Sequence, residues 1–324
     1  ILDSNEYSLY KLLNELNNLN KFEDIEVFPI ICSIQDKKNI NLIFKTWLPD
    51  TVYHAAAYKH VPIVEYNLSE GLKNNVIGTL NLAKASLETK VKNFVFISTD
   101  KAVRPTNIMG ASKRIAEMII QNTSLNFPER RMGIVRFGNV LDSSGSVVPL
   151  FREQIKKRLP ITVTHPEITR YFMSIGEAAR LVIQAGAMSK NGEVFLLDMG
   201  EPIKILQLAK RMIELNDIQS IENSAVKRNI EIIFSGLRPG EKLFEELLID
   251  DVSTSTIHPK IKRAKEKFIP WNKLKGHLNK LEKGVSNADP SLIKSVLEKI
   301  VDGYPNTNAT IPSTNVRPSH KNLK

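Results

Sequence analysis

The sequence of 324 residues lacks several features that would point to particular classes of protein. It has one cysteine, Cys32, which excludes internal disulfide bonds and metal sites built from several cysteines, and we expect no metal ion. It has no run of about 18 uncharged apolar residues, so we expect no transmembrane helix within it. The hydrophobic fraction of 42% and the charged fraction of 25% are ordinary for a globular protein. These features favour a globular protein of the reducing cytoplasm.

Positive charge is concentrated at one end of the chain. The formal net charge is +10, and residues 260–324 hold 14 Lys and Arg residues against 5 Asp and Glu residues. The rest of the chain is therefore close to neutral. The basic segment is either a solvated surface or a contact for an anionic membrane, at the cytoplasmic face of the inner membrane. Aromatic residues are not interleaved with the basic ones and there is no arginine-rich helix, so we expect no nucleic-acid partner.

Short β-branched runs alternate with longer amphipathic stretches along the chain. This alternation, with strands that are apolar throughout, predicts an α/β fold with a doubly wound parallel sheet covered on both faces. The predicted strands are 51–57, 93–98, 132–138, 193–200 and 230–236. The predicted helices are 71–88, 107–121, 145–158 and 202–216.

The first seventy residues contain no glycine. A doubly wound sheet that binds a dinucleotide has a Gly-rich turn after its first strand, and an acidic residue about 20 residues later at the end of the second. The opening residues ILD can be the end of such a second strand, with Asp3 as the acidic residue. We therefore expect that the first strand and the Gly-rich turn are missing from this sequence. Alternatively, Asp3 only caps the helix that follows.

The segment STDKAVRPTNIMGASKR, residues 98–114, brings together side chains that could do chemistry. It directly follows the predicted strand NFVFIS, so Ser98 to Lys101 lie at a strand's carboxyl end, where open α/β sheets place their sites. A helix then begins near Asn107, and Met109 and Lys113 share one of its faces because they are four residues apart. Taken residue by residue, the segment can also be a loop with a solvated Asp–Lys pair and a core methionine.

Taken whole, this segment resembles the site of the extended short-chain dehydrogenase superfamily, which pairs a strand-end serine or threonine with Tyr-x-x-x-Lys. More narrowly, the sequence resembles the nucleotide-sugar 4,6-dehydratases of bacterial polysaccharide synthesis, the CapD-like branch, from about Asp3 to about Leu248. Four other segments carry the resemblance: HAAAYKHVPIVE (54–65), NNVIGT (74–79), RFGNVLDSSGSVVP (136–149) and LRPGEKLFEEL (237–247).

The resemblance implies a cofactor, NAD or NADP. Small side chains at residues 55–57 would let a dinucleotide lie against the backbone, although tight packing of strand and helix explains them as well. Lys113 would bond to the nicotinamide ribose, and Asn75 would brace the neighbouring loop. The expected cofactor-binding residues are Asp3, Ser33, Ile34, Ala55, Ala56, Ala57, Asn75, Ser98 and Lys113.

The resemblance also implies a UDP-sugar substrate. Arg238 and Glu241 suit opposite ends of a uridine diphosphate, because arginine pairs with phosphate oxygens and a carboxylate accepts hydrogen bonds from ribose hydroxyls. Ser146 and Val147 begin a predicted helix whose backbone N–H groups can bind a phosphate. Each of these residues can also have a role without a ligand. The segment with Arg238 and Glu241 can be an exposed turn, Arg170 a surface arginine, and His60 a structural histidine. The expected substrate-binding residues are Lys59, His60, Asn139, Ser146, Val147, Arg170, Arg238 and Glu241.

The implied reaction is the internal redox dehydration of UDP-N-acetylglucosamine. Hydride leaves carbon 4 of the hexose, and Lys101 removes the hydrogen on carbon 5, for which burial and neighbouring charge are expected to lower its pKa. Asp100, in its protonated form, protonates the hydroxyl on carbon 6, and hydride returns to carbon 6. Thr99 would hydrogen-bond to the oxygen on carbon 4. Met109 stands where the superfamily has a tyrosine that takes the proton from the sugar hydroxyl as hydride leaves. A thioether cannot accept that proton. The expected catalytic residues are Thr99, Asp100, Lys101, Met109 and Lys113.

Two other functions fit the same residues. A nucleotide-sugar epimerase needs the oxidation at carbon 4 without the elimination, so the Asp–Lys pair disfavours it. A non-catalytic binding module is favoured by Met109 and by the missing glycine turn.

The expected domains follow from the matched segments. We expect a dinucleotide-binding domain and a smaller α/β substrate domain, and assembly into a homo-oligomer. The predicted boundaries are 1–139 and 175–200 for the first domain, 140–174 and 201–258 for the second, 259–302 for a basic helical extension, and 303–324 for a disordered tail.

Overall fold

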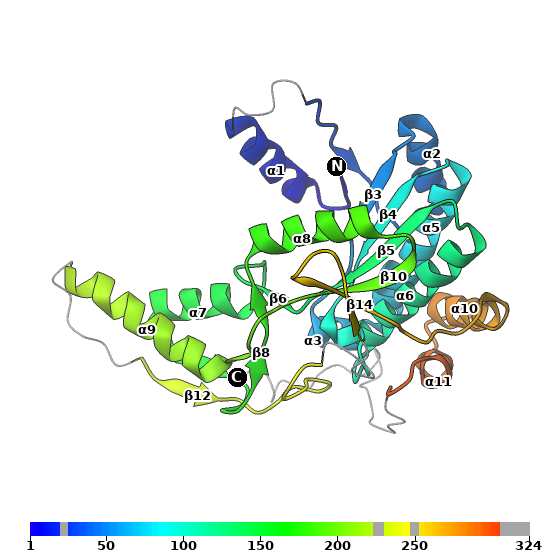
Figure 1. Cartoon of the computed structure of the whole chain (residues 1–324). Coiled ribbons are helices and arrows are strands. Elements are labelled where there is room, and N and C mark those ends of the chain that lie inside the picture. Colours follow the sequence, from blue (N-terminus) through cyan, green and yellow to red (C-terminus); the bar gives the residue numbers. More distant parts are fainter. Residues whose placement is uncertain (20–24, 223–229, 247–252, 305–324) are drawn as a thin grey trace.

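The computed structural model describes residues 1–19, 25–222, 230–246 and 253–304, and every structural statement below concerns these residues. A large lobe surrounds a six-stranded sheet, and a smaller lobe lies beside it (Figure 1). The helices are α1 (Glu6–Asn18), α2 (Lys37–Trp47), α3 (Val61–Tyr66), α4 (Leu68–Leu72), α5 (Thr79–Glu88), α6 (Ile108–Asn126), α7 (Val147–Lys156), α8 (Ile175–Met188), α9 (Ile205–Glu222), α10 (Trp271–Ser286) and α11 (Pro290–Ile300), with a π-helical turn η1 (Lys73–Gly78) and a 3-10 turn η2 (Asp100–Ala102). The strands are β1 (Leu2–Asp3), β2 (Ile30–Ile31), β3 (Thr51–His54), β4 (Asn93–Ile97), β5 (Arg131–Arg136), β6 (Asn139–Val140), β7 (Ile161–Val163), β8 (Thr169–Arg170), β9 (Phe172–Met173), β10 (Asn191–Leu197), β11 (Ile203–Lys204), β12 (Ile232–Phe234), β13 (Ser253–Ser255) and β14 (Ile261–Ala264).

Four parallel strands form the centre of the large sheet, in the spatial order β3-β4-β5-β10. β14 and then β13 extend the sheet beyond β10 in antiparallel orientation. β1 and β2 pair in parallel as a separate two-stranded sheet, so Asp3 does stand at the end of a short strand. Asp3 accepts a hydrogen bond from the backbone N–H of Asn5, but the residue that caps α1 is Asn5, whose side chain accepts from Ser8, so the capping alternative for Asp3 is wrong.

The strands are apolar on both faces because helices cover both faces of the sheet. In β4, Phe94 and Phe96 pack into the core formed with α2, α5 and α6. Val95 points to the opposite face, where with Val135 it packs against α8 (Figure 1). This alternation with period two places the four apolar side chains of the strand, Phe94 to Ile97, in one or the other of two cores. The predicted class, an α/β fold with a doubly wound, mainly parallel sheet, is confirmed.

The smaller lobe has a core of its own. α7, α9 and β7 contribute Phe151, Ile155, Ile161, Val163 and Ile205 to it. The predicted strand at 230–236 is present as β12, but it pairs in parallel with β7 in this lobe instead of joining the large sheet.

The predicted helix 71–88 is interrupted. α4 ends at Leu72, the turn η1 follows with hydrogen bonds five residues apart, and α5 begins at Thr79. π-helical turns insert an extra residue into a helix and are frequent at functional sites. The turn contains Asn74 and Asn75, which are both buried. The helical periodicity of the sequence did not reveal this interruption, because the apolar spacing is similar on either side of it.

The basic segment is more than a helical extension. α10 and α11 are helices, as expected, but β14 pairs with β10 as a strand of the large sheet, and β13 pairs with β14. Leu274 and Leu278 of α10 and Ile293 of α11 belong to the same buried core as α6. The chain between residues 253 and 300 is therefore integral to the large lobe. Of the expected tail, Tyr304 packs against this core, and residues 305–324 lie outside the described residues.

Within the part of the chain that the structure describes, no helix is both long and apolar enough to span a bilayer. The contact of the basic segment with an anionic membrane, the cytoplasmic location and the homo-oligomer stay predictions.

Candidate functional site

The carboxyl end of β4 holds the turn that the sequence singled out. Thr99 caps η2, and its hydroxyl donates a hydrogen bond to Asp100 Oδ1 at 2.8 Å. The backbone N–H of Asp100 donates to the carbonyl of Phe137 at 3.2 Å. Because Phe137 follows β5 directly, two neighbouring strand ends fix the position of the turn.

Asp100 and Lys101 form an ion pair inside this turn. Lys101 Nζ lies 3.0 Å from Asp100 Oδ1, 3.4 Å from Asn139 Oδ1 and 3.6 Å from Glu245 Oε1. The carboxyl of Asp100 is fully buried, and its Oδ2 has no hydrogen-bond partner among the described residues. Burial alone would lower the pKa of Lys101, but the carboxylates of Asp100 and Glu245 outweigh it, so the pKa lies above its ordinary value. The expected lowering of this pKa is therefore wrong, and Lys101 carries a proton at neutral pH beside Asp100.

Lys113 reaches the same strand end from α6. Its Nζ donates to the carbonyl of Ile97 at 2.6 Å and lies 4.0 Å from the centre of the Phe96 ring. Burial lowers the pKa of Lys113 to about 7, although the carboxylate of Glu117 opposes this shift. Met109 lies one turn earlier on the helix and is 3% exposed. An amino group that titrates near neutral pH and a thioether thus stand side by side on one helix face, as their spacing predicts.

A buried charge network fastens α6 to β4 and β5. Glu117 accepts a hydrogen bond from Ser98 Oγ at 2.7 Å and two from Arg136, at 2.7 and 2.6 Å. Arg136 also pairs with Glu266, and Arg114 pairs with Glu117 at 2.9 Å. Two arginines therefore compensate two glutamates inside the core, which is the condition under which buried charges are tolerated.

Asn75 braces the loop that follows β3. Its Oδ1 accepts from the backbone N–H of Tyr58 at 2.8 Å, and its Nδ2 donates to the carbonyl of Tyr58 at 3.0 Å. The same Nδ2 donates to Ser112 Oγ on α6 at 2.9 Å. Asn75 therefore connects the loop with α6, in agreement with the bracing role expected from the sequence.

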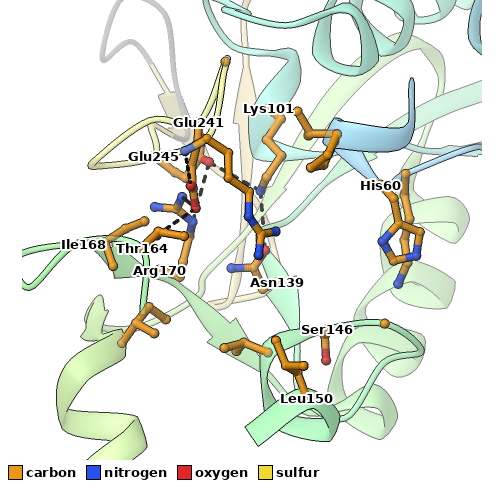
Figure 2. Close-up of a pocket in the computed structure, with 18 of the residues that line it drawn as sticks. His60, Lys101, Asn139, Ser146, Leu150, Thr164, Ile168, Arg170, Glu241 and Glu245 are labelled. Atoms are coloured by element: carbon orange, nitrogen blue, oxygen red, sulfur yellow. Dashed lines mark hydrogen bonds and ion pairs between the residues drawn. The ribbon is translucent and has the colours of Figure 1, made fainter. Parts of the chain in front are cut away.

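Three adjoining clefts run along the carboxyl ends of the strands. The first cleft, between the lobes, is lined by Lys59, His60, Lys101, Asn139, Ser146, Val147, Arg170, Arg238, Glu241 and Glu245 among others (Figure 2). The second cleft shares Lys59, His60, Lys101, Asn139 and Ser146 with the first, and adds Ala55, Ala57, Ser98, Thr99, Met109 and Lys113. The third cleft shares Ala55 and Ala57 with the second, and adds Asp3, Ile34 and Ala56. The clefts thus form a continuous path from β1 to the smaller lobe.

Most of the predicted site residues line this path, although they come from segments far apart in the sequence. Among the described residues, Ser33, Asn75 and Asp100 are predicted site residues that do not line it. Asn75 and Asp100 lie directly behind residues that do, namely Tyr58 and Lys101. The individual binding and catalytic roles stay predictions.

Glu245 is a residue for which the sequence predicted no role, and its side chain is 4% exposed on the wall of the first cleft. It lies in the quoted segment LRPGEKLFEEL beside Glu246, and no local pattern separates the two. The close approach of Gly145 to His60 was missed as well. A Cβ atom on Gly145, which has a φ of +67°, would lie 2.3 Å from His60 Cε1. Only the glycine lets the two cleft walls approach so closely.

Gly110→Ala tests how tightly the turn η2 is packed on α6. A Cβ atom at Gly110 would lie 2.2 Å from the backbone carbonyl of Lys101, so the turn must shift. We expect the free energy of unfolding in urea to fall by about 1–3 kcal/mol, the usual cost of overpacking. Gly276→Ala in α10 is the matched control, because nothing lies within 4 Å of its added Cβ, and alanine should stabilise that helix by up to about 1 kcal/mol. Equal stabilities of the two variants would contradict the tight packing.

The parallel sheet and a site at its carboxyl edge define a Rossmann-like protein of the short-chain dehydrogenase type. The chain belongs to the family described as "Polysaccharide biosynthesis protein", which it matches over residues 1–266. It is 49% identical over 266 residues to the capsular polysaccharide biosynthesis protein CapD of Staphylococcus aureus, covering 82% of this chain and 43% of that protein. The chain thus spans less than half the length of this curated relative. The resemblance to the CapD-like branch is confirmed.

Other similar proteins carry more specific names. A UDP-N-acetylglucosamine 4,6-dehydratase (inverting) of Campylobacter jejuni is 34% identical, with 74% of this chain and 70% of that protein covered. A UDP-glucose 4-epimerase of Rickettsia canadensis is 38% identical, with 61% and 56% covered. Among solved structures, Pen from Bacillus thuringiensis superposes with a TM-score of 0.72 at 34% identity, covering 81% of this chain and 78% of that chain.

Proposed function

We propose that the chain catalyses the 4,6-dehydration of UDP-N-acetylglucosamine to the 4-keto-6-deoxy sugar, for the synthesis of a surface polysaccharide. The observation that carries this proposal is the Asp100–Lys101 ion pair at the edge of the first and second clefts. A proton donor and a proton acceptor are what an elimination needs beyond the oxidation itself. The similarity to the Campylobacter jejuni dehydratase supports the same reaction.

The second and third clefts fit a dinucleotide cofactor, NAD or NADP. Ala55, Ala56 and Ala57 line them with the smallest side chains available, so an extended molecule can lie against the backbone. Lys113 places a cation on the wall of the second cleft, and Asp3 places a carboxylate in the third. Such a cofactor, when bound, supplies the reversible hydride transfer.

The first cleft fits a UDP-sugar. Lys59, Arg170 and Arg238 provide cations for a diphosphate, and Glu241 provides a carboxylate for ribose hydroxyls. Ser146 precedes α7, and its hydroxyl is buried without a hydrogen-bond partner among the described residues. A polar group and a helix N-terminus are thus free to bind phosphate oxygens.

The Asp100–Lys101 pair can hold two protonation states. At rest it is a carboxylate and an ammonium joined by the 3.0 Å hydrogen bond. Transfer of one proton along this bond gives a carboxylic acid and an amine, with no change in net charge. The amine can then remove the hydrogen on carbon 5, and the ammonium so formed can give its proton to the hydroxyl on carbon 6, which leaves as water and restores the amine. Asp100 itself is buried behind Lys101, so we propose that the two residues act as a unit, with Lys101 as the member that touches the sugar.

The function is tested by incubating the protein with UDP-N-acetylglucosamine and NAD or NADP in deuterated water. We expect a product lighter by one water, with a solvent deuterium on carbon 5, because the proton removed there exchanges before it returns. Mass spectrometry and NMR read both changes. Substrate recovered unchanged in every condition would count against any dehydratase and would favour a binding module.

An epimerase is the second candidate, because a relative of that name is 38% identical to this chain. It would use the same oxidation at carbon 4 and return hydride to the opposite face without losing water. In the same experiment it gives an isomer of unchanged mass. The Asp100–Lys101 pair, which an epimerase does not need, is the reason why we place it second.

A further inference from the structure

Glu245 is a buried carboxylate between Lys101 and Arg170. Its Oε1 lies 3.6 Å from Lys101 Nζ and 3.7 Å from Arg170 Nε. Its Oε2 is buried and has no hydrogen-bond partner among the described residues. Figure 2 shows the three side chains together on one wall of the first cleft, opposite His60 and Ser146.

We propose that Glu245 is a positioning residue, which holds the ammonium group of Lys101 at the wall of the first cleft and links it to Arg170. The inference rests on the function proposed above and adds a residue to it. Lys101 is the flexible member of the catalytic pair, because a lysine has four rotatable carbon–carbon bonds while Asp100 is fixed by Thr99. A second carboxylate on the other side of its ammonium limits the positions that it can adopt.

The charges of this cluster support the assignment. Asp100 and Glu245 carry two negative charges, and Lys101 and Arg170 carry two positive ones. If Lys101 passes its proton to Asp100, Glu245 keeps its partner Arg170, and the cluster stays neutral. Without Glu245, no carboxylate would contact both Lys101 and Arg170: Asp100 would still pair with Lys101 and Glu241 with Arg170, but Lys101 would lose its proton more readily.

The pKa of Lys101 depends on its whole surroundings. Burial lowers this pKa, whereas Asp100 and Glu245 raise it and Arg170 lowers it. Arg170 in turn contacts Glu241, at 3.4 Å. The other titratable or charged groups that line the first and second clefts beside Lys101 are Lys59, His60, Lys113, Arg238 and Glu241. Removing one carboxylate at 3.6 Å therefore takes away one of the two groups that keep the ammonium charged.

Glu246 offers a matched control within the same segment. Its side chain is 43% exposed, and it pairs with Arg104 at 3.0 Å and with Lys242 at 3.7 Å, away from Lys101. Glu246→Gln removes the same charge from the next residue in the chain without touching the cluster.

The first measurement is the pH dependence of kcat/KM for UDP-N-acetylglucosamine. In Glu245→Gln, we expect the alkaline limb of the profile, where Lys101 loses its proton, to move to lower pH by about 1–3 units, the usual effect of a close opposite charge. In Glu246→Gln the profile should coincide with that of the unchanged protein. Glu245→Asp keeps the charge but draws it back, so its limb should lie between the two. A profile of Glu245→Gln that does not move overturns the proposal.

The second measurement needs no turnover. In protein labelled with ¹³C at lysine side chains, the Lys101 signal is identified by its loss in Lys101→Met. Its titration should move to lower pH in Glu245→Gln and stay in place in Glu246→Gln. If it moves in a protein that forms no dehydrated product, the proposed function fails while the role of Glu245 stands. If the titration of Lys101 does not move in Glu245→Gln, the role of Glu245 is refuted whatever the reaction.

Discussion

Lys101→Met and Asp100→Asn should each lower the rate of dehydration by about 100-fold to 10,000-fold, the usual contribution of a positioned acid or base. Lys101→Met removes the group that reaches the clefts, and Asp100→Asn removes the acceptor to which Lys101 passes its proton at 3.0 Å. The measurement is the initial rate of product formation from UDP-N-acetylglucosamine, with nucleotide binding followed by calorimetry. Binding should stay within a few fold, because the diphosphate cations are untouched.

The control for this pair is Lys92→Met. Lys92 is exposed and pairs with Asp50 at 2.8 Å on the surface, far along the sheet from the turn because it precedes β4. Lys92→Met removes the same charge as Lys101→Met and should leave the rate of dehydration unchanged. Turnover that persists in both Lys101→Met and Asp100→Asn would remove the catalytic assignment and leave the fold untouched.

Arg136→Met should have the largest effect on stability, with a loss of about 3–5 kcal/mol in the free energy of unfolding. Arg136 is completely buried, and its removal leaves the carboxylates of Glu117 and Glu266 with one arginine between them. Urea unfolding measures the loss. Arg152→Met breaks an exposed pair with Asp142 and should cost less than about 1 kcal/mol.

The same network predicts how the stability of the fold depends on pH below neutrality. Burial raises the pKa of Glu117, but Arg136 and Arg114 outweigh it and hold the pKa at about 2. A carboxyl with a lowered pKa stabilises the fold above its unfolded-state pKa and loses that contribution as the pH falls through its folded-state value. Stability should therefore decline from about pH 4.5 towards pH 2, and in Glu117→Gln this part of the decline should be absent. The double variant with Arg136→Met should cost less than the sum of the two single changes, because both remove one interaction.

The sequence predicted the alternation of strands and helices and the place of the site because both depend on local patterns. Val95 between Phe94 and Phe96 already shows a strand that is apolar on both faces, and Thr99 to Lys101 follow that strand directly. Strand β14 was missed because its sequence, IKRA, is half charged, and the basic segment was read as a surface. β14 lies between β13 and β10, and its charged residues fit there because Lys262 is exposed and Arg263 is half-buried beside Glu193, while Ile261 and Ala264 are buried.

The role of Glu245 could not be predicted from the sequence. Glu245 and Glu246 are adjacent and identical in type, yet one is buried beside Lys101 and the other is exposed. Their difference arises from how the segment 237–246 docks, with the carbonyl of Gly240 accepting hydrogen bonds from Thr106 and Asn107. Such a contact joins residues more than 130 positions apart, and no local spacing encodes it.

The packing of α10 and α11 shows that the segment matched by the family model and the hydrophobic core do not end at the same residue. The family model matches residues 1–266, whereas the core that contains α6 continues through Leu297 and Ile300. Asn122 of α6 donates a hydrogen bond to the carbonyl of Ile269, just beyond that match. The segment that the family model covers is thus shorter than the hydrophobic core to which it belongs. A protein truncated at the end of the family match would lose part of this hydrophobic core. In such a protein the amide protons of α4 and η1 should exchange faster, because α10 packs against both.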